Sequence, residues 1–89
     1  MSPFRGGVTI DGVAAPVDTV IEVYVGEGAT PRATAMMTAP GAYEVVVFGA
    51  GVDVGQPVTF VVTGLTAVTT PPDPLFASYE PQTVDLAVP

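Results

Sequence analysis

Residues 17–25 of the 89-residue sequence read Val-Asp-Thr-Val-Ile-Glu-Val-Tyr-Val, and they contain the clearest strand pattern in the chain. Successive side chains of a strand point to opposite faces, and Val, Ile, Thr and Tyr all favour strands. The alternation places Val17, Thr19, Ile21, Val23 and Val25 on one face, and Asp18, Val20, Glu22 and Tyr24 on the other. This pattern predicts a half-buried β-strand.

The same alternation predicts further short strands along the rest of the chain. They cover residues 7–10, 13–15, 32–39, 42–49, 56–64, 65–70 and 82–88. Asp11-Gly12 is a typical two-residue hairpin turn. The ten Gly and ten Pro are distributed along the whole chain, and because both residue types interrupt helices, no stretch is left that could form a long helix. The spacing of strands and turns predicts an all-β fold, an antiparallel β-sandwich of six to seven short strands forming a single domain, 1–89.

Alternation also separates an inward face of each strand from an outward face. The predicted inward face consists of Val8, Ile10, Ile21, Val23, Tyr43, Val45, Val47, Val58, Phe60, Val62, Val84 and Leu86. Outward positions of a free sandwich are normally polar, yet four of them are apolar: Val20, Val46, Phe48 and Val61. Apolar surface of this extent tends to be covered, so we expect it to contact another segment or another subunit.

The residue types that are missing exclude several kinds of chemistry. The sequence has no Cys, His, Trp or Lys. Thiolate metal sites, thiol nucleophiles, imidazole bases and Schiff-base lysines are therefore absent. Ser2 and Ser78 are the only serines, and no His or Lys is present to activate either of them. We therefore expect a protein that is not an enzyme, with no catalytic residues and no cofactor.

The charge balance argues against nucleic acid and membrane partners. The formal net charge is −7, and the only basic side chains are Arg5 and Arg32. Nucleic acids and anionic membrane surfaces are bound through Lys and Arg, which are nearly absent here. The sequence also has no apolar run long enough for a membrane-spanning helix, and its first residues do not resemble a signal peptide.

The carboxylates and aromatic residues each allow a functional and a structural interpretation. Calcium could be bound by Asp11, Asp18, Asp53, Asp73 and Asp85, but no calcium-loop spacing is present and turn carboxylates are the favoured interpretation. Glu22 and Glu44 could form a glycosidase pair, but both fall on outward faces. The sequence therefore predicts no metal site. Sugar stacking by Tyr24, Phe48, Phe76 and Tyr79 remains the alternative to packing.

Four segments of the sequence resemble a known group of modules. Residues 7–16 resemble the opening strand and turn of prealbumin-like domains, which include the carboxypeptidase regulatory-like domains, and residues 20–25 resemble their second strand. Residues 38–45 and 56–64 resemble a later hairpin and strand of the same group. The resemblance covers residues 6–88 and implies an Ig-like (prealbumin-like) sandwich. Most such modules are non-catalytic accessories, stalks and surface repeats.

The Pro-rich segment 71–81 is expected to act as an arm or a cover, because a free linker rarely keeps aromatic residues in water. Together with the apolar outward positions it predicts an assembly interface, formed by Val20, Tyr24, Val46, Phe48, Val61, Leu75, Phe76 and Tyr79.

The leading hypothesis from the sequence is a non-catalytic structural subunit of an ordered surface assembly. Examples are a virion or capsid decoration protein, a tail protein, and a filament or layer on an extracellular surface. Its partners would be further copies of itself or a larger protein assembly, reached by apolar contact and by strand or arm exchange. The alternative is a carbohydrate- or peptide-binding accessory module of a secreted enzyme or adhesin.

Overall fold

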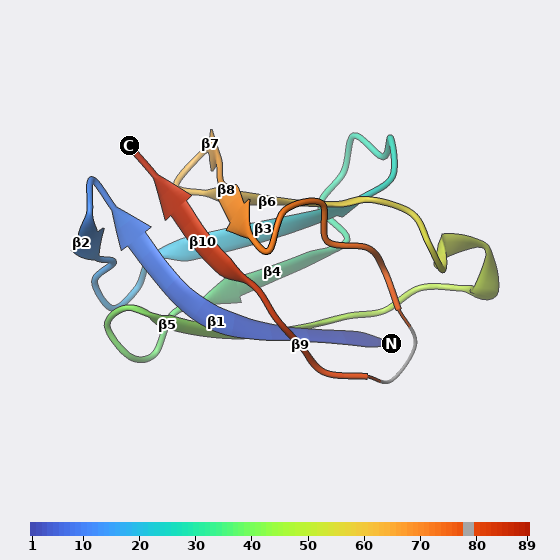
Figure 1. The fold of residues 1–89 in the computed structure, drawn as a ribbon, viewed down its shortest axis with the longest axis horizontal. Coiled ribbons are helices and arrows are strands. Elements are labelled where there is room, and N and C mark those ends of the chain that lie inside the picture. Colours follow the sequence, from blue (N-terminus) through green and yellow to red (C-terminus); the bar gives the residue numbers. More distant parts are fainter. Residues whose placement is uncertain (78–79) are drawn as a thin grey trace.

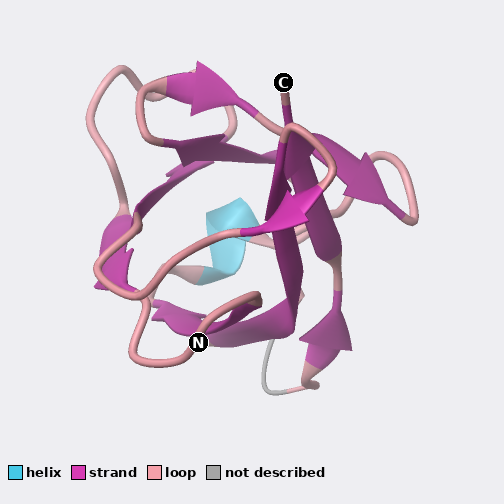
Figure 2. Ribbon diagram, turned by 90° about the vertical axis from the view of Figure 1, so that its left-hand side faces the viewer, coloured by secondary structure: helices cyan, strands magenta, loops and turns pink. Residues whose placement is uncertain are grey.

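Two facing β-sheets make up the molecule in a computed structural model that describes residues 1–77 and 80–89 (Figure 1). The strands are β1 (Ser2–Ile10), β2 (Val13–Ala14), β3 (Val20–Val25), β4 (Ala33–Met36), β5 (Ala42–Val47), β6 (Val58–Val62), β7 (Leu65–Thr66), β8 (Val68–Thr70), β9 (Gln82–Thr83) and β10 (Asp85–Val88). A single 3₁₀ turn, η1 (Gly51–Asp53), interrupts the loop that follows β5. Seen along the long axis, the strands enclose the interior (Figure 2). The predicted all-β sandwich is confirmed.

Strand β1 is the centre of the first sheet. It pairs with β5 and β2 on one side and with β9 and β10 on the other, and β8 lies beyond β10. The pairings with β9 and β10 are parallel, whereas the sequence predicted an antiparallel sandwich. The second sheet, β4-β3-β6-β7, is antiparallel throughout. Alternation indicates which face a residue occupies but not which neighbour a strand chooses, so it could not predict the parallel pairs.

The number of strands is higher than the predicted six to seven. Strand β1 begins at Ser2, five residues before the predicted start, even though it contains Pro3. The predicted strands 65–70 and 82–88 are each divided, at Ala67 and at Val84. The predicted strand at 17–25 begins only at Val20, because Asp18 adopts a left-handed turn conformation with φ of 74°.

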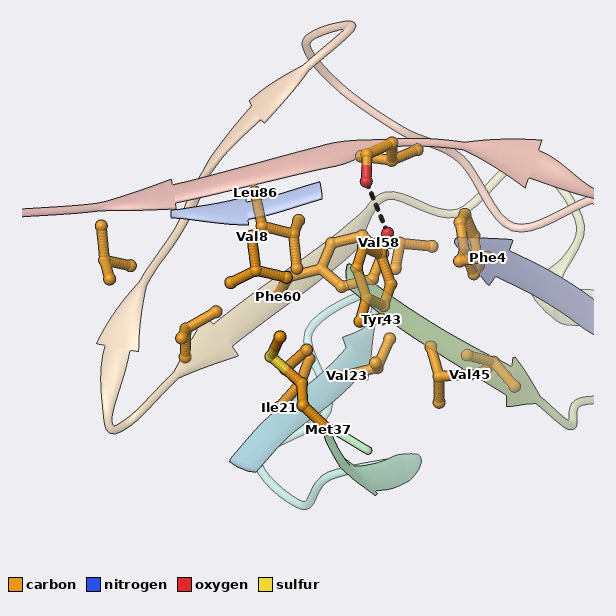
Figure 3. Packing of buried hydrophobic residues seen from close by; sticks show 14 of the residues in the cluster. Phe4, Val8, Ile21, Val23, Met37, Tyr43, Val45, Val58, Phe60 and Leu86 are labelled. Atoms are coloured by element: carbon orange, nitrogen blue, oxygen red, sulfur yellow. Dashed lines mark hydrogen bonds between the residues drawn. The ribbon is translucent and has the colours of Figure 1, made fainter. Parts of the chain in front are cut away.

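The core lies between the sheets and contains nearly all of the predicted inward face (Figure 3). Ile10 is the exception, because it is only partly buried at the end of β1. The sequence prediction missed further buried residues: Phe4, Ala15, Val25, Met37, Phe76 and Val88. Phe60 is at the centre, with its ring 5.3 Å from that of Phe4 and 6.0 Å from that of Tyr43, both edge to face. Edge-to-face packing is one of the two arrangements that aromatic quadrupoles favour.

The parallel ladder between β1 and the C-terminal strands is interrupted where Val84 separates β9 from β10. A Cβ atom on Gly6 would lie 2.4 Å from the carbonyl oxygen of Val84, so only glycine fits at this crossing. At this interruption, two backbone groups form hydrogen bonds with side chains instead of with the neighbouring strand. The backbone N–H of Gly7 donates to Oδ1 of Asp85 at 2.8 Å, and the hydroxyl of Tyr43 donates to the carbonyl of Val84 at 2.7 Å.

Two hairpins turn through left-handed residue pairs. Asp11 and Gly12 have φ values of 53° and 75°, which confirms the predicted turn between β1 and β2. Thr63 and Gly64, between β6 and β7, have φ values of 49° and 82°. Left-handed backbone is costly for a β-branched residue, so Thr63 is a strained position.

The Pro-rich segment packs on its own chain through residues 74–76. The N–H of Phe76 donates to the carbonyl of Gln56, and the N–H of Val58 donates to the carbonyl of Pro74, both at 2.9 Å. Phe76 is 2% exposed and belongs to the core, so the prediction that it forms part of an interface is wrong. Leu75 of the same segment is 47% exposed. The predicted interface residue Tyr79 lies outside the described residues.

Candidate interaction surfaces

The outward apolar residues predicted as an interface fall into separate groups in the structure. Val20, Tyr24 and Val61 lie on the outer face of the second sheet, where Glu22 pairs with Val61 and lies between Val20 and Tyr24 along β3. Val46 lies on β5 in the first sheet, next to Pro3. The structure therefore brings Val20, Tyr24 and Val61 onto one face, with polar residues between them, and separates them from Val46.

Three exposed apolar side chains lie on the segment that follows β5, and one of them, Val52, is the most exposed large apolar side chain among the described residues. Phe48 is 68% exposed, Val52 is 82% exposed and Val54 is 51% exposed. This segment, residues 48–54, is called the apolar loop below. It projects beyond the sheets at the end of the molecule where the chain begins (Figure 1). Alternation in the sequence predicted an outward Phe48, whereas residues 50–55 lie between two predicted strands and were expected only to connect them. Two valines among the glycines of this loop were the signal that could have revealed it.

An ion pair holds the apolar loop in place. Arg32, from the loop between β3 and β4, donates two hydrogen bonds to the carboxylate of Asp53, at 2.9 and 3.3 Å. The same carboxylate accepts the backbone N–H of Ala50 at 2.8 Å. The hydrogen bonds from Arg32 and from the Ala50 N–H, in that order, lower the pKa of Asp53 below its ordinary value. One of the two basic side chains of the protein is thus used to fasten this loop.

The buried residue Phe76 contacts the backbone at both ends of the apolar loop. The N–H of Gly55 donates to the carbonyl of Phe76 at 2.9 Å. A Cβ atom on Gly49 would lie 2.9 Å from the ring of Phe76 and 2.6 Å from the carboxylate of Asp53, so the backbone approaches both closely. The loop therefore displays Phe48, Val52 and Val54 on a backbone that is anchored at several points.

Other exposed apolar residues lie on different elements. Val20 and Met36 face each other across β3 and β4, and they are 38% and 61% exposed. Val13 on β2 and Val68 on β8 are 67% and 71% exposed. These residues lie in strand ladders away from the apolar loop. They are suitable controls for experiments on it.

The described residues do not form a reactive or metal-binding cluster. No group of three or more acidic, His or Cys side chains close enough to hold a metal ion occurs in residues 1–77 and 80–89. Glu22 and Glu44 lie on the outer faces of different sheets, so they do not form a pair. A groove of about 260 Å³ over β1, β8 and β10 contains the single carboxylate of Asp85, which already accepts the Gly7 N–H.

Within the described part of the chain, no helix has the length and apolar character needed to cross a membrane.

Comparison with known proteins adds no relative to this description. No protein-family model matches the chain, and neither the curated proteins nor the solved structures provide a significant match.

Proposed function

We propose that this protein is a non-catalytic structural subunit of an ordered surface assembly, such as a virion decoration or tail protein or a surface filament or layer. We further propose that its sandwich is of the Ig-like, prealbumin-like type, and that it works on a virion or an extracellular surface. The observation that supports the proposal is the apolar loop, which presents Phe48, Val52 and Val54 to solvent on an anchored backbone. An anchored apolar projection loses little conformational entropy when it docks.

The charge of the protein determines which forces can drive association. Only 12% of the residues are charged, and the net charge is −7. Copies therefore repel one another at long range, and association must come from apolar burial and main-chain pairing. Because salt screens charge repulsion between exposed groups, raising the ionic strength should strengthen assembly. An assembly held by salt bridges would respond in the opposite way.

The test compares assembly of the wild type with that of a variant of the apolar loop. Phe48→Ser, Val52→Ser and Val54→Ser are combined, and the control combines Val13→Ser and Val68→Ser, which also replace exposed apolar side chains. Sedimentation velocity and electron microscopy over a concentration series measure the assemblies. The proposal expects ordered assemblies for the wild type and the control, and folded, unassembled protein for the loop variant.

Two results would overturn the proposal. One is a wild type that stays monomeric at high concentration and binds no shell or lattice. The other is a loop variant that assembles as well as the control. A monomeric wild type that binds glycans on an array would instead support the accessory-module alternative.

A further inference from the structure

We propose that the peptide bond between Asp73 and Pro74 is a self-cleavage site, at which the side chain of Asp73 divides the protein into residues 1–73 and 74–89. The reaction takes place once in each molecule and needs only water in addition to the chain's own atoms. It is therefore compatible with a protein that is not an enzyme. The inference does not rest on the proposed function, because it concerns neither the apolar loop nor any assembly contact.

The residue types on the two sides of this bond favour cleavage between them. Asp73-Pro74 is the only Asp-Pro pair in the sequence. The aspartate side chain is short enough for a carboxyl oxygen to reach the carbonyl carbon of its own residue and close a small ring. The proline nitrogen carries alkyl substituents in place of a hydrogen. It is therefore more basic than an ordinary peptide nitrogen, and it leaves more readily once it is protonated.

The backbone at Asp73 has a conformation that its place in the sequence opposes. Its φ is 55°, in the left-handed region. Left-handed backbone is costly for residues that have a Cβ atom, although aspartate tolerates it better than most. The following proline adds to the cost, because its Cδ atom clashes with the preceding residue outside extended conformations. Breaking the bond to Pro74 removes this second restriction, so the folded structure stores strain that cleavage releases.

The surrounding structure prevents Asp73 from relaxing. On the N-terminal side, Thr70 is paired within the β8–β10 ladder. On the C-terminal side, the carbonyl of Pro74 accepts the N–H of Val58 at 2.9 Å, and Phe76 is buried in the core. Only residues 71–73, part of the orange trace that follows β8 in Figure 1, connect these fixed points. Strained backbone persists only where its surroundings enforce it, and it is concentrated at functional sites.

The reaction consists of two balanced steps. In the first, a carboxyl oxygen of Asp73 bonds to the carbonyl carbon of the same residue, the bond from that carbon to the Pro74 nitrogen breaks, and the carboxyl proton moves to the nitrogen. The products are a cyclic anhydride on Asp73 and a free amine on Pro74. In the second step, water adds to the anhydride and opens it to two carboxyl groups. Asp73 is exposed, so water has access to the anhydride.

The two products stay associated in the folded molecule. Fragment 74–89 places Phe76 and Leu86 in the core, and its strands β9 and β10 pair with β1. Cleavage therefore does not change the size of the native protein, and it has to be measured on the denatured chain.

The test is mass spectrometry of the intact protein under denaturing conditions, on samples taken during incubation at pH 5, within the range in which folded proteins are usually most stable. One sample is folded, as circular dichroism verifies, and the other is kept unfolded in urea at the same pH and temperature. We expect the masses of residues 1–73 and 74–89 to accumulate about tenfold faster in the folded sample. This ratio corresponds to about 1.4 kcal/mol of strain released in the transition state.

Two variants identify the reacting group. Asp73→Ala removes the carboxyl group and should abolish cleavage in both samples. Asp73→Glu keeps the charge but enlarges the ring that must close, so it should cleave more slowly than the wild type. The comparison in urea does not depend on folding, so a variant that fails to fold still tests the carboxyl group. A wild type that stays intact, cleavage as fast in urea as in the folded protein, or cleavage that continues in Asp73→Ala would overturn the proposal.

Discussion

Replacing Tyr43 with phenylalanine tests the hydrogen bond that closes the break in the first sheet. The Tyr43 hydroxyl donates to the carbonyl of Val84 at 2.7 Å inside the core, and no other hydrogen bond to that carbonyl occurs among the described residues. Phenylalanine keeps the ring and its contact with Phe60 but leaves the carbonyl without this donor. An unsatisfied buried acceptor costs about 1–3 kcal/mol. We therefore expect Tyr43→Phe to lower the free energy of unfolding by about 2 kcal/mol.

Urea unfolding at pH 7 measures the effect. Small proteins have a denaturant slope of about 1–2 kcal/mol per molar urea, so the midpoint should fall by about 1–2 M with no change in slope. Tyr24→Phe is the control, because Tyr24 lies on the outer face of the second sheet and its hydroxyl forms no hydrogen bond with described residues. Its effect should stay within about 0.5 kcal/mol.

Alkaline pH separates the hydrogen bond from a simple packing change. Burial, and to a lesser extent the nearby Asp85 carboxylate, raises the pKa of Tyr43 above its ordinary value. In the unfolded chain the same tyrosine ionises near pH 10, so above that pH the folded state binds more protons than the unfolded state. The stabilisation of the folded state by the protonated Tyr43 hydroxyl is therefore complete below about pH 10. As the pH rises further, the free energy of unfolding falls by about 1.4 kcal/mol per pH unit. Tyr43→Phe lacks this added slope. An unchanged urea midpoint at pH 7, or an alkaline slope equal to that of the wild type, would refute the reasoning.

Three further changes test other parts of the structure. Phe60→Ala should lower the unfolding free energy by about 3–5 kcal/mol in urea titrations, because Phe60 is completely buried; a small loss would show that the inward face is assigned incorrectly. Thr63→Asn should raise the thermal midpoint, with a gain of about 1 kcal/mol, because asparagine tolerates left-handed backbone; no gain would mean that Thr63 is unstrained. The pKa of Asp53, followed by NMR as pH falls, should lie below its ordinary value and rise in Arg32→Gln. An unchanged titration in Arg32→Gln would show that the loop is not held by the ion pair.

The inward face was predictable wherever a strand alternates without interruption. Strands β3, β5 and β6 alternate between buried and more exposed side chains, and periodicity identified them. The first half of β1 was missed because Pro3 and Gly6 usually weaken strands. The structure accommodates both residues through tertiary neighbours: Pro3 lies opposite Val46 in a pair that needs no N–H, and Gly6 allows Val84 to approach.

The candidate surfaces were less predictable, because they depend on contacts between distant segments. An apolar arm that covers its own chain and one that reaches a neighbour have the same sequence pattern, so the burial of Phe76 could not be inferred. The apolar loop depends on Arg32 and Asp53, which are 21 residues apart in the sequence and belong to different loops. Neither residue shows a local signal of this pairing.

The parallel pairing of β1 with β10 has a mechanical consequence. Because the two strands run in the same direction, the first and last residues of this chain lie toward opposite ends of a molecule whose longest dimension is 36 Å (Figure 1). A stretching force applied between those ends pulls along the β1–β10 ladder and loads all of its hydrogen bonds in shear at once. An antiparallel pair pulled from adjacent ends would instead unzip one bond at a time. The domain is therefore expected to resist extension along its long axis and to unfold abruptly when the ladder yields.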